Sequence, residues 1–487
     1  MSSHIIGRER EVALLKKQLA SKEPQLIAVY GRRRIGKTHL IREFYRDKGV
    51  YIQFTGVQDG SMAEQLANLH DELCSLFGQW TDKPPPKDWR EAFNRLVQSV
   101  KPLLKEQRVV IFFDEVPWLA STSGFLKALE YSWNQHLGAL PGLVVVLCGS
   151  SSSWMIQQVI QNKGGLHGRL TAKIHLQPFS LLETEQFLHH RGVRLSRHQI
   201  IELYMVLGGV AQYLKAVPPG LSTSQIVHQL CFSPQGLLFR EFYPLYRSLF
   251  DQAERYVAIV QSLASQRYGL SQPLLLQKAG LSSGGSATKL LRELEESGLI
   301  LYLPSLAGKK LATKKKGGIY RLIDEYSLFY LHWIQNAAPS ILTGLDPHYW
   351  TLQQQSQRWA IWAGYTFENI CFRHIHQIKQ ALGLAAVATI ESSWLAPEAC
   401  SGGAQIDLVI DRADRCINLC EMKFHSRPLV INRQLAEQLE RKRKLFGEAT
   451  ATPKSLFTTL ISSHGIAESS SFLHVIDQQI TMEQLFS

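Results

Sequence analysis

Short apolar runs alternate with amphipathic stretches over the first third of the chain. The apolar runs occupy residues 25–30, 50–54, 108–113 and 143–148. Helical spacing recurs in the intervals between them, at residues 39–44, 62–77, 89–104 and 124–136. Because nearly continuous apolar runs are typical of parallel strands buried on both faces, this alternation predicts an α/β domain on a parallel sheet.

Two further patterns follow. Helical spacing at residues 255–266, 274–279 and 286–297, followed by strand patterns at 298–303 and 319–323, predicts a winged helix. After an aromatic-rich helical stretch at 333–357, the pattern restarts with a helix at 362–378 and strands at 405–410 and 416–424. A polar helix is predicted at 432–446. The expected domains are an α/β core at 1–175, a helical lid at 176–240, a winged helix at 241–335, a helical connector at 336–358 and an α/β tail at 359–487.

Composition restricts the class of protein. The 487 residues are 45% hydrophobic and 19% charged, as expected for a globular chain, and the net charge of +12 favours an anionic partner. There is no apolar signal core near the start and no run of about 18 apolar residues, so we expect a cytoplasmic protein without a membrane partner. Seven scattered cysteines indicate reduced thiols. Cys416 and Cys420 have no second pair to suggest zinc.

The stretch after the first apolar run carries the clearest chemistry. The residues Gly31, Arg32, Arg33, Arg34, Ile35, Gly36, Lys37 and Thr38 match G-x-x-x-x-G-K-[ST], the phosphate-binding loop of nucleoside triphosphatases. The glycines let backbone N–H groups point at a triphosphate, Lys37 places a charge on the β/γ-phosphates, and Thr38 offers a hydroxyl to Mg²⁺. The sequence therefore predicts that ATP and Mg²⁺ bind here.

Polar residues end two later strands of the same predicted sheet. Asp114 and Glu115 follow one apolar run, and Ser150 follows another. Since ligands of such sheets bind beyond the carboxyl ends of the strands, Asp114 is expected to hold the Mg²⁺ shell. Glu115 would activate the attacking water, and Ser150 would hydrogen-bond that water or the γ-phosphate. An ordinary acidic turn is the alternative for Asp114 and Glu115.

These motifs resemble a known family as a set. The segments that carry the resemblance are Ile6-Gly7-Arg8-Glu9, the phosphate loop, Phe113-Asp114-Glu115, Cys148-Gly149-Ser150-Ser151 and residues 166–170, 176–180 and 208–214. They look like the archaeal-type ATPases, in the signalling-ATPase branch of AAA+ proteins, over residues 4 to about 335. The resemblance implies that Ile6, Gly7 and Arg8 lie near the nucleotide base. It makes Arg169 a candidate contact to the γ-phosphate, in the same chain or across subunits of a homo-oligomer; a plain surface arginine is the alternative.

The predicted winged helix leaves two roles open. Its hairpin tip carries five lysines, Lys309, Lys310, Lys314, Lys315 and Lys316, which would grip phosphates. The third helix carries Glu293, Glu295 and Glu296, which repel DNA. DNA contact, including transcription regulation through the wing, and a purely internal hinge over the nucleotide both remain open. The run Arg441–Lys444 is either a solvated face or a second anion-binding cluster.

The C-terminal strands carry a third constellation. Glu421 and Lys423 lie two apart on one predicted strand and therefore share a face, where Asp407 of the neighbouring strand can meet them. Two carboxylates suit Mg²⁺, and a lysine would steady a hydroxide or the charge developing on phosphorus. Glu368, in the preceding helix, would complete the acid cluster.

This segment resembles the PD-(D/E)xK nuclease superfamily, and it is similar to the C-terminal domain that often accompanies archaeal-type ATPases. The resemblance implies that Glu368, Asp407, Glu421 and Lys423 are metal and catalytic residues, with Gln434 or Gln438 assisting. A nuclease-like fold without activity and a chance pattern are the alternatives. We therefore expect an ATPase whose nucleotide state controls cleavage of nucleic acid, DNA ahead of RNA. The competing hypothesis is an ATP-dependent assembly or signalling switch, or a DNA-binding regulator, with an inactive tail.

Overall fold

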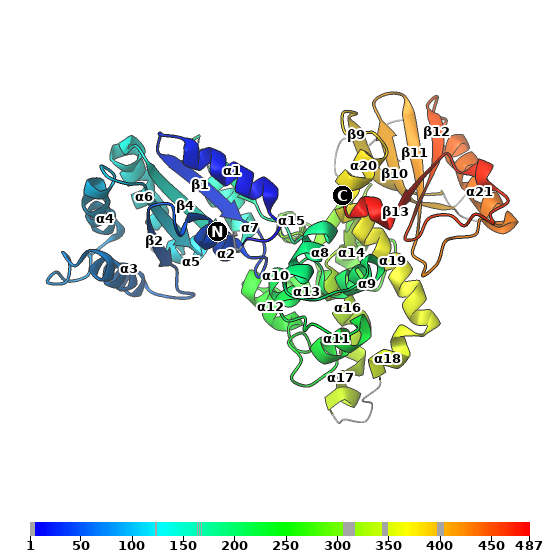
Figure 1. Cartoon of the computed structure of the whole chain (residues 1–487), viewed down its shortest axis with the longest axis horizontal. Helices are drawn as coiled ribbons and strands as arrows, with labels where there is room; N and C mark the ends of the chain where they lie inside the picture. Colours follow the sequence, from blue (N-terminus) through cyan, green and yellow to red (C-terminus); the bar gives the residue numbers. More distant parts are fainter. Residues whose placement is uncertain are drawn as a thin grey trace. The chain divides into compact units, whose positions relative to one another are not determined.

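The computed structural model describes residues 5–121, 124–162, 164, 166, 168–304, 317–342, 349–396 and 404–487. They fall into two compact units, Met1–Pro178 and Phe179–Ser487 (Figure 1). The first break lies close to the predicted end of the ATPase core at 175. The finer boundaries predicted within residues 179–487 stay predictions. No helix of the described residues is long and apolar enough to cross a membrane.

The first unit is built on a five-stranded parallel sheet. Its strands are β1 (Gln25–Tyr30), β2 (Val50–Thr55), β3 (Val109–Asp114), β4 (Leu143–Gly149) and β5 (Ala172–His175). Their order is β2-β3-β4-β1-β5, and every neighbouring pair is parallel. The four predicted strands are confirmed to within one residue at each end. The fifth was not predicted, because its four residues alternate between buried and exposed side chains instead of forming an apolar run.

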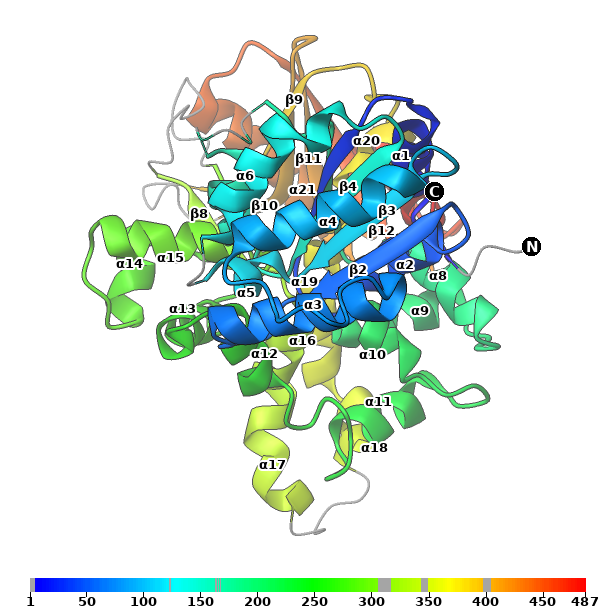
Figure 2. The ribbon, with the colours of Figure 1, turned by 90° about the vertical axis from the view of Figure 1, so that its left-hand side faces the viewer.

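Helices cover both faces of this sheet. They are α1 (Glu9–Ala20), α2 (Lys37–Tyr45), α3 (Met62–Phe77), α4 (Trp89–Leu103), α5 (Val116–Ala120), α6 (Phe125–Gln135) and α7 (Ser152–Met155), with short turns η1 (Leu137–Ala139) and η2 (Ile156–Ile160). One core places α3, α4 and α6 against alternate strand residues, and a second core places α1 and α2 against the others (Figure 1). In Figure 2, α3 and α4 lie side by side next to β2. The sheet is thus buried on both sides, as its apolar strands predicted.

The second unit begins with five helices, of which the first four lie in the range predicted for the lid and the fifth lies just beyond it. They are α8 (Leu181–His190), α9 (Arg197–Leu207), α10 (Ala211–Lys215), α11 (Thr223–Cys231) and α12 (Phe242–Leu249). Serines cap three of them: the side chains of Ser180, Ser196 and Ser222 accept the backbone N–H three residues on, and the Glu or Gln at that position returns the bond. Reciprocal caps of this kind satisfy N–H groups that a helix start leaves unpaired, so they set where α8, α9 and α11 begin.

Three helices and a small sheet follow, and we call them the α13–β8 segment. Its elements are α13 (Ala253–Ala264), β6 (Leu270–Ser271), α14 (Gln272–Lys278), α15 (Gly285–Glu296), β7 (Ile300–Leu303) and β8 (Ile319–Leu322). The sheet order is β6-β8-β7, and both pairs are antiparallel. The three predicted helices and two predicted strands are present. The assignment as a winged helix stays a prediction, and the tip lysines Lys309, Lys310 and Lys314–Lys316 lie outside the described residues.

The remaining residues form a connector and the C-terminal α/β domain. The connector holds α16 (Glu325–Phe329), the π-helical turn η3 (Tyr330–Ile334), α17 (Gln335–Leu342) and α18 (Tyr349–Gln354). The domain holds α19 (Gln357–Arg373), α20 (Ile375–Ala381), β9 (Thr389–Leu395), β10 (Gln405–Arg412), β11 (Cys416–Lys423), α21 (Arg433–Thr450), β12 (Ser455–Ser462), η4 (Leu473–Val475), β13 (Gln478–Thr481) and α22 (Met482–Leu485). Its sheet has the order β13-β12-β11-β10-β9, with β9, β10 and β11 antiparallel and β11, β12 and β13 parallel.

The helix predicted at 362–378 is wrong in one respect, because it divides at His374. The His374 side chain is buried; its Nδ1 lies 2.8 Å from the Ile370 carbonyl oxygen, and its Nε2 accepts the Leu181 backbone N–H at 3.0 Å. Burial lowers the pKa of His374 to about 4, so the ring is neutral and can make both bonds.

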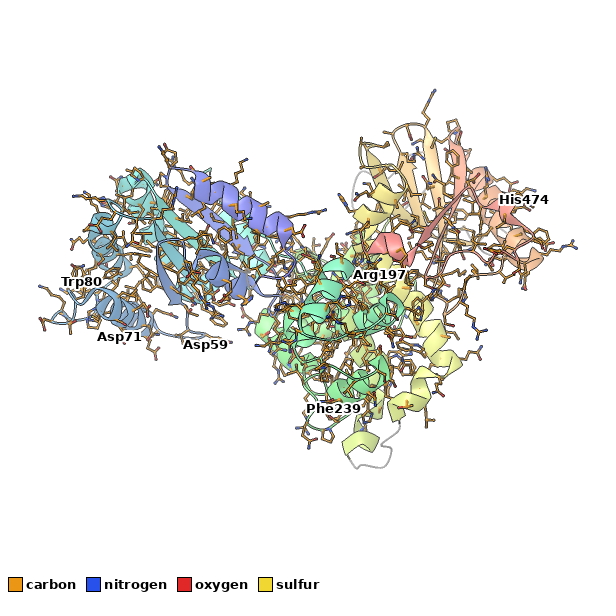
Figure 3. All side chains as sticks on the ribbon, viewed as in Figure 1. Asp59, Asp71, Trp80, Arg197, Phe239 and His474 are labelled. Atoms are coloured by element: carbon orange, nitrogen blue, oxygen red, sulfur yellow. The ribbon has the colours of Figure 1, made fainter. Side chains whose placement is uncertain are left out.

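One apolar core joins the helices after residue 179, the α13–β8 segment and the C-terminal domain. Arg197 of α9 illustrates the connection (Figure 3). Its guanidinium pairs with Glu185 at 3.0 Å and with Glu483 of α22, and it lies 4.8 Å from the centre of the Phe486 ring. These parts of the second unit are therefore packed as a single body.

Candidate functional site

The phosphate loop begins where β1 ends, and its backbone is shaped by glycine. Gly31 has φ of 148°, and a Cβ there would lie 2.2 Å from the Leu176 carbonyl oxygen. Gly36, with φ of 94°, precedes Lys37, the first residue of α2. Arg34 also adopts a left-handed conformation, with φ of 72°. These positions favour glycine or cost strain, so the loop is held in a curled form that a larger residue at 31 would break.

Lys37 closes the loop from inside. Its Nζ donates to the carbonyl oxygens of Gly31 at 2.8 Å and Arg32 at 2.9 Å, and only 6% of the residue is exposed. The ammonium group is thus placed at the start of a helix whose unpaired N–H groups attract anions. That this charge contacts the β/γ-phosphates stays a prediction.

The end of β3 contacts the last residue of the loop. The Thr38 hydroxyl donates to Asp114 Oδ2 at 2.7 Å, and Asp114 Oδ1 accepts the Glu115 backbone N–H at 3.1 Å. A hydroxyl and a buried carboxylate in contact are the donors that Mg²⁺ takes beside a nucleotide, so these residues fit magnesium.

Glu115 lies in a strained backbone conformation beside this pair. It has φ of 49° and ψ of 51°, which a residue with a side chain rarely adopts. Its Oε2 accepts the Ser150 hydroxyl at 2.7 Å and the Ser150 backbone N–H at 3.1 Å. The structure therefore brings the predicted Glu115 and Ser150 together, and it gives Ser150 a partner that the sequence did not indicate.

The N-terminal segment is tied to the loop through Arg8. Its guanidinium donates to the Ile35 carbonyl at 3.1 Å and to the Gln177 carbonyl at 2.7 Å, and the side chain is buried. Gly7, beside Ile6, has φ of 65°. Arg8 therefore braces the loop through backbone oxygens, and the expected proximity of Ile6, Gly7 and Arg8 to a base stays a prediction.

Other loop residues are either buried or in contact with a neighbouring aromatic ring. Ile35 is 1% exposed and packs in the core under the sheet, and Arg32 is also buried. The Arg33 guanidinium lies 5.0 Å from the centre of the Trp118 ring. These contacts hold the loop in place from both sides.

Arg169 lies at the other end of the sheet from the loop. It is exposed and precedes β5, and the Thr171 backbone N–H donates to the Leu26 carbonyl, four residues before β1 ends. A strand rises by about 3.3 Å per residue, so Arg169 lies more than about 13 Å from the end of β1, measured along the strands. The structure does not bring Arg169 to the loop of its own chain.

Residues 5–217 match the family model described as an ATPase domain predominantly from Archaea. The N-terminal part of the chain is therefore an ATPase domain of the archaeal type, as its motifs predicted. The chain is also similar to the uncharacterized protein MJECL04 of Methanocaldococcus jannaschii, which is 22% identical over 444 residues, or 91% of this chain and 92% of that protein.

Two solved structures are similar to part of the chain. The Walker-type ATPase paby2304 of Pyrococcus abyssi is 19% identical with a TM-score of 0.47, over 67% of this chain and 96% of that one. The ORC2 protein of Aeropyrum pernix, in ADPNP–ADP complexes, is 15% identical with a TM-score of 0.43, over 71% and 97%. At TM-scores this low, neither assigns a function to this chain.

The C-terminal constellation also comes together. The register that pairs Leu408 with Cys420 places Asp407 opposite Glu421, and Lys423 Nζ lies 2.8 Å from Glu421 Oε1. They line a cavity of about 550 Å³, which we call the C-terminal pocket. Its other lining residues are Arg267, Tyr268, Ala404, Gln405, Gln434, Gln438, Arg441 and Lys442.

Cations neutralise the carboxylates of this pocket. Lys423 and Lys442 both contact Glu421, Lys442 at 2.5 Å; burial acts to raise the pKa of Glu421, but the two lysines outweigh it and lower that pKa. Asp407 accepts the Met422 backbone N–H at 3.0 Å. Burial, with the charges of Glu421 and Glu368, raises the pKa of Asp407 to about 7.

Glu368 forms ion pairs with two arginines of the α13–β8 segment. Its Oε2 lies 2.7 Å from the guanidinium of Arg321 on β8, and its Oε1 lies 3.1 Å from that of Arg267, between α13 and β6. Glu368 is 1% exposed and Arg321 is 2% exposed, so this is a buried ion pair. Among the described residues, no group of three or more His, Cys, Asp or Glu side chains is arranged to hold a metal ion. The carboxylates as arranged therefore do not fit the expected magnesium centre.

Sequence reasoning missed Arg267 and Arg321, and it named Lys442 only within the basic run Arg441–Lys444, without its contact to Glu421. A signal existed for Lys442, because Gln434, Gln438 and Lys442 are spaced by four and share one face of α21. The two arginines carry no local signal, since they lie 101 and 47 residues from Glu368.

The buried pair gives a prediction about stability. We expect Arg321→Met and Glu368→Leu each to destabilise the second unit by about 3–5 kcal/mol, because each leaves a buried charge without its main partner. The double variant should lose clearly less than the sum of the two. Denaturant unfolding of the four proteins measures this cycle.

The matched control is Lys379→Met, which removes a cation from the half-exposed pair with Glu391 and should cost about 1 kcal/mol or less. Additive losses in the Arg321–Glu368 cycle would show that the two charges do not stabilise one another.

Proposed function

We propose that this protein hydrolyses ATP with magnesium in its N-terminal domain and binds nucleic acid with its C-terminal domain. The observation that carries the proposal is the junction of the loop with the strand ends. Lys37 is enclosed by the loop, Thr38 contacts Asp114, and Glu115 contacts Ser150. Such an arrangement supplies the phosphate-binding, metal-binding and water-activating groups of phosphoryl transfer to water.

The residues for nucleotide binding are those of the loop and its neighbours. Backbone N–H groups of residues 31–38 and the Lys37 ammonium would hold the phosphates, and Thr38 with Asp114 would hold the metal. When bound, magnesium neutralises phosphate charge and so eases attack on the terminal phosphorus.

Glu115 is the group that would accept a proton from the attacking water. Its contact with Ser150 places the carboxylate at the end of β4, and its release from Ser150 would free both oxygens. Arg169 would reach a nucleotide only in another copy of the chain, so a role for it depends on self-assembly.

The C-terminal pocket supports the nucleic-acid part of the proposal. Four of its lining residues are cations, Arg267, Lys423, Arg441 and Lys442, against the two carboxylates Asp407 and Glu421. This excess of positive charge, in a chain of net charge +12, suits a phosphodiester backbone. Because the second unit is one packed body, we infer that nucleotide state acts on that unit as a whole and does not move its pocket walls separately.

Cleavage of the nucleic acid is the second candidate function. It is favoured by the Glu421–Lys423 contact with Asp407 directly opposite, on two neighbouring antiparallel strands. It is opposed by the cations that already occupy Glu368 and Glu421.

The ATPase proposal predicts a specific loss. Glu115→Gln should reduce kcat for ATP by about 100-fold or more, with little change in KM, because an amide cannot accept the proton. Phosphate release under saturating ATP and magnesium measures it. Glu106→Gln, an exposed change in the turn before β3, is the matched control and should behave as wild type. Wild-type turnover in the Glu115 variant would remove Glu115 from the mechanism.

Plasmid nicking separates the two candidates. With magnesium, and with or without ATP, we expect the wild-type protein to retard supercoiled plasmid in a gel while leaving it intact, because the pocket carboxylates are neutralised. Asp407→Asn and Lys423→Met are run alongside. Nicking by the wild type that disappears in both variants would contradict this expectation and establish the second candidate.

A further inference from the structure

A second cavity, of about 500 Å³, adjoins the C-terminal pocket. Arg267 lines both cavities. The other residues of the second cavity come from α13, η3, α19 and their neighbours: Ala264, Ser265, Leu328, His332, Gln357, Arg358, Ile361, Trp362 and Tyr365. We call it the aromatic cavity. The Tyr365 carbonyl accepts a hydrogen bond from Arg321, the partner of Glu368, so the two cavities share one framework.

Arginines and aromatic rings line the aromatic cavity together. Trp362 and Tyr365 are largely buried, whereas Ile361 is 58% exposed at the rim. The Arg358 guanidinium lies 4.5 Å from the centre of the Trp333 ring and donates to the His332 carbonyl at 3.0 Å. Trp362 Nε1 has no hydrogen-bond acceptor in the part of the chain that the structure describes. The cavity thus offers apolar surface and two guanidinium groups.

The charge of the cavity excludes a cationic ligand. Among the described residues no Asp or Glu lines it, while Arg267 and Arg358 do. His332 contributes no charge, because burial and the neighbouring Arg358 lower its pKa to about 4. His332 also lies in a π-helical turn, a rare element that often occurs at functional sites.

We propose that the aromatic cavity binds an unpaired base of a nucleic-acid strand whose backbone continues past Arg267 into the C-terminal pocket. The inference rests on the proposed nucleic-acid binding and names its substrate class as single-stranded. Aromatic faces beside arginines are the usual means of holding unpaired bases, since every base has a face to stack. A cavity of this volume accepts a small molecule or one nucleotide, whereas a duplex keeps its bases stacked on one another.

Fluorescence anisotropy tests the proposal without cleavage. The probes are a labelled 12-nucleotide oligo-dT, the same strand with abasic sites, and a blunt 12-base-pair duplex, at one salt concentration with EDTA. We expect the full protein to bind oligo-dT about tenfold more tightly than either other probe, because only oligo-dT supplies both a phosphate backbone and unpaired bases.

Three variants test whether the strand occupies the two cavities. Arg358→Ala and Ile361→Glu alter only the aromatic cavity, and Arg267→Ala alters both cavities; each should weaken oligo-dT binding about fivefold to tenfold. The matched controls are Arg194→Ala, an exposed arginine between α8 and α9, and Leu352→Glu, an exposed leucine of α18; neither residue lines either cavity. Both controls should bind within twofold of wild type.

The outcomes separate this inference from the function on which it rests. If wild type binds oligo-dT and the Arg358 and Ile361 variants bind equally well, the aromatic cavity is not the base site and the inference is overturned, while nucleic-acid binding stands. Equal binding of the abasic strand or the duplex by wild type also overturns it. If wild type binds none of the three probes, the nucleic-acid part of the proposed function fails as well.

Discussion

The enclosure of Lys37 by its own loop is the interaction on which the ATPase domain depends. Lys37 is only 6% exposed, so its ammonium group needs oxygen partners, and the carbonyls of Gly31 and Arg32 supply them. These bonds hold the backbone in a curled form. Only glycine fits at position 31 of that form, because the Leu176 carbonyl oxygen occupies the space of a Cβ. Arg8 braces the same loop from the N-terminal segment. The parallel order of β1, β4 and β3 then brings Thr38, Asp114, Glu115 and Ser150 to one edge of the sheet.

Charge neutralisation is the corresponding constraint in the second unit. Buried carboxylates are costly unless cations or hydrogen bonds compensate them. Glu368 has Arg321 and Arg267, Glu421 has Lys423 and Lys442, and Asp407 has a backbone N–H and a raised pKa. The same cations that stabilise the carboxylates also leave a positive wall around the C-terminal pocket. In the folded chain, Asp407, Glu421 and Lys423 of the nuclease-like pattern thus line a pocket with four cations and two carboxylates.

Local patterns predicted most of the strands, the helices and the ATP site, and long-range contacts explain what they left out. The phosphate loop is contiguous, and Asp114 and Ser150 each follow an apolar run, so spacing alone places them. Glu421 and Lys423 share a strand face for the same reason. The strands β5, β6, β9, β12 and β13 were not predicted; β5, for one, alternates between buried and exposed residues instead of forming an apolar run. Arg321 and Arg267 reach Glu368 across 47 and 101 residues, and no local pattern records such a pair. Likewise, Ser150 holds Glu115 from 35 residues away.

Nucleotide binding by the purified chain is the most direct test of the central claim. Isothermal titration calorimetry of ATP with magnesium should give saturable binding of one nucleotide per chain, and Lys37→Ala should abolish it while circular dichroism stays unchanged. If the wild-type chain, folded by the same spectrum, gives no heat and retains no nucleotide in equilibrium dialysis, the enclosed ammonium does not serve a triphosphate and the account is contradicted.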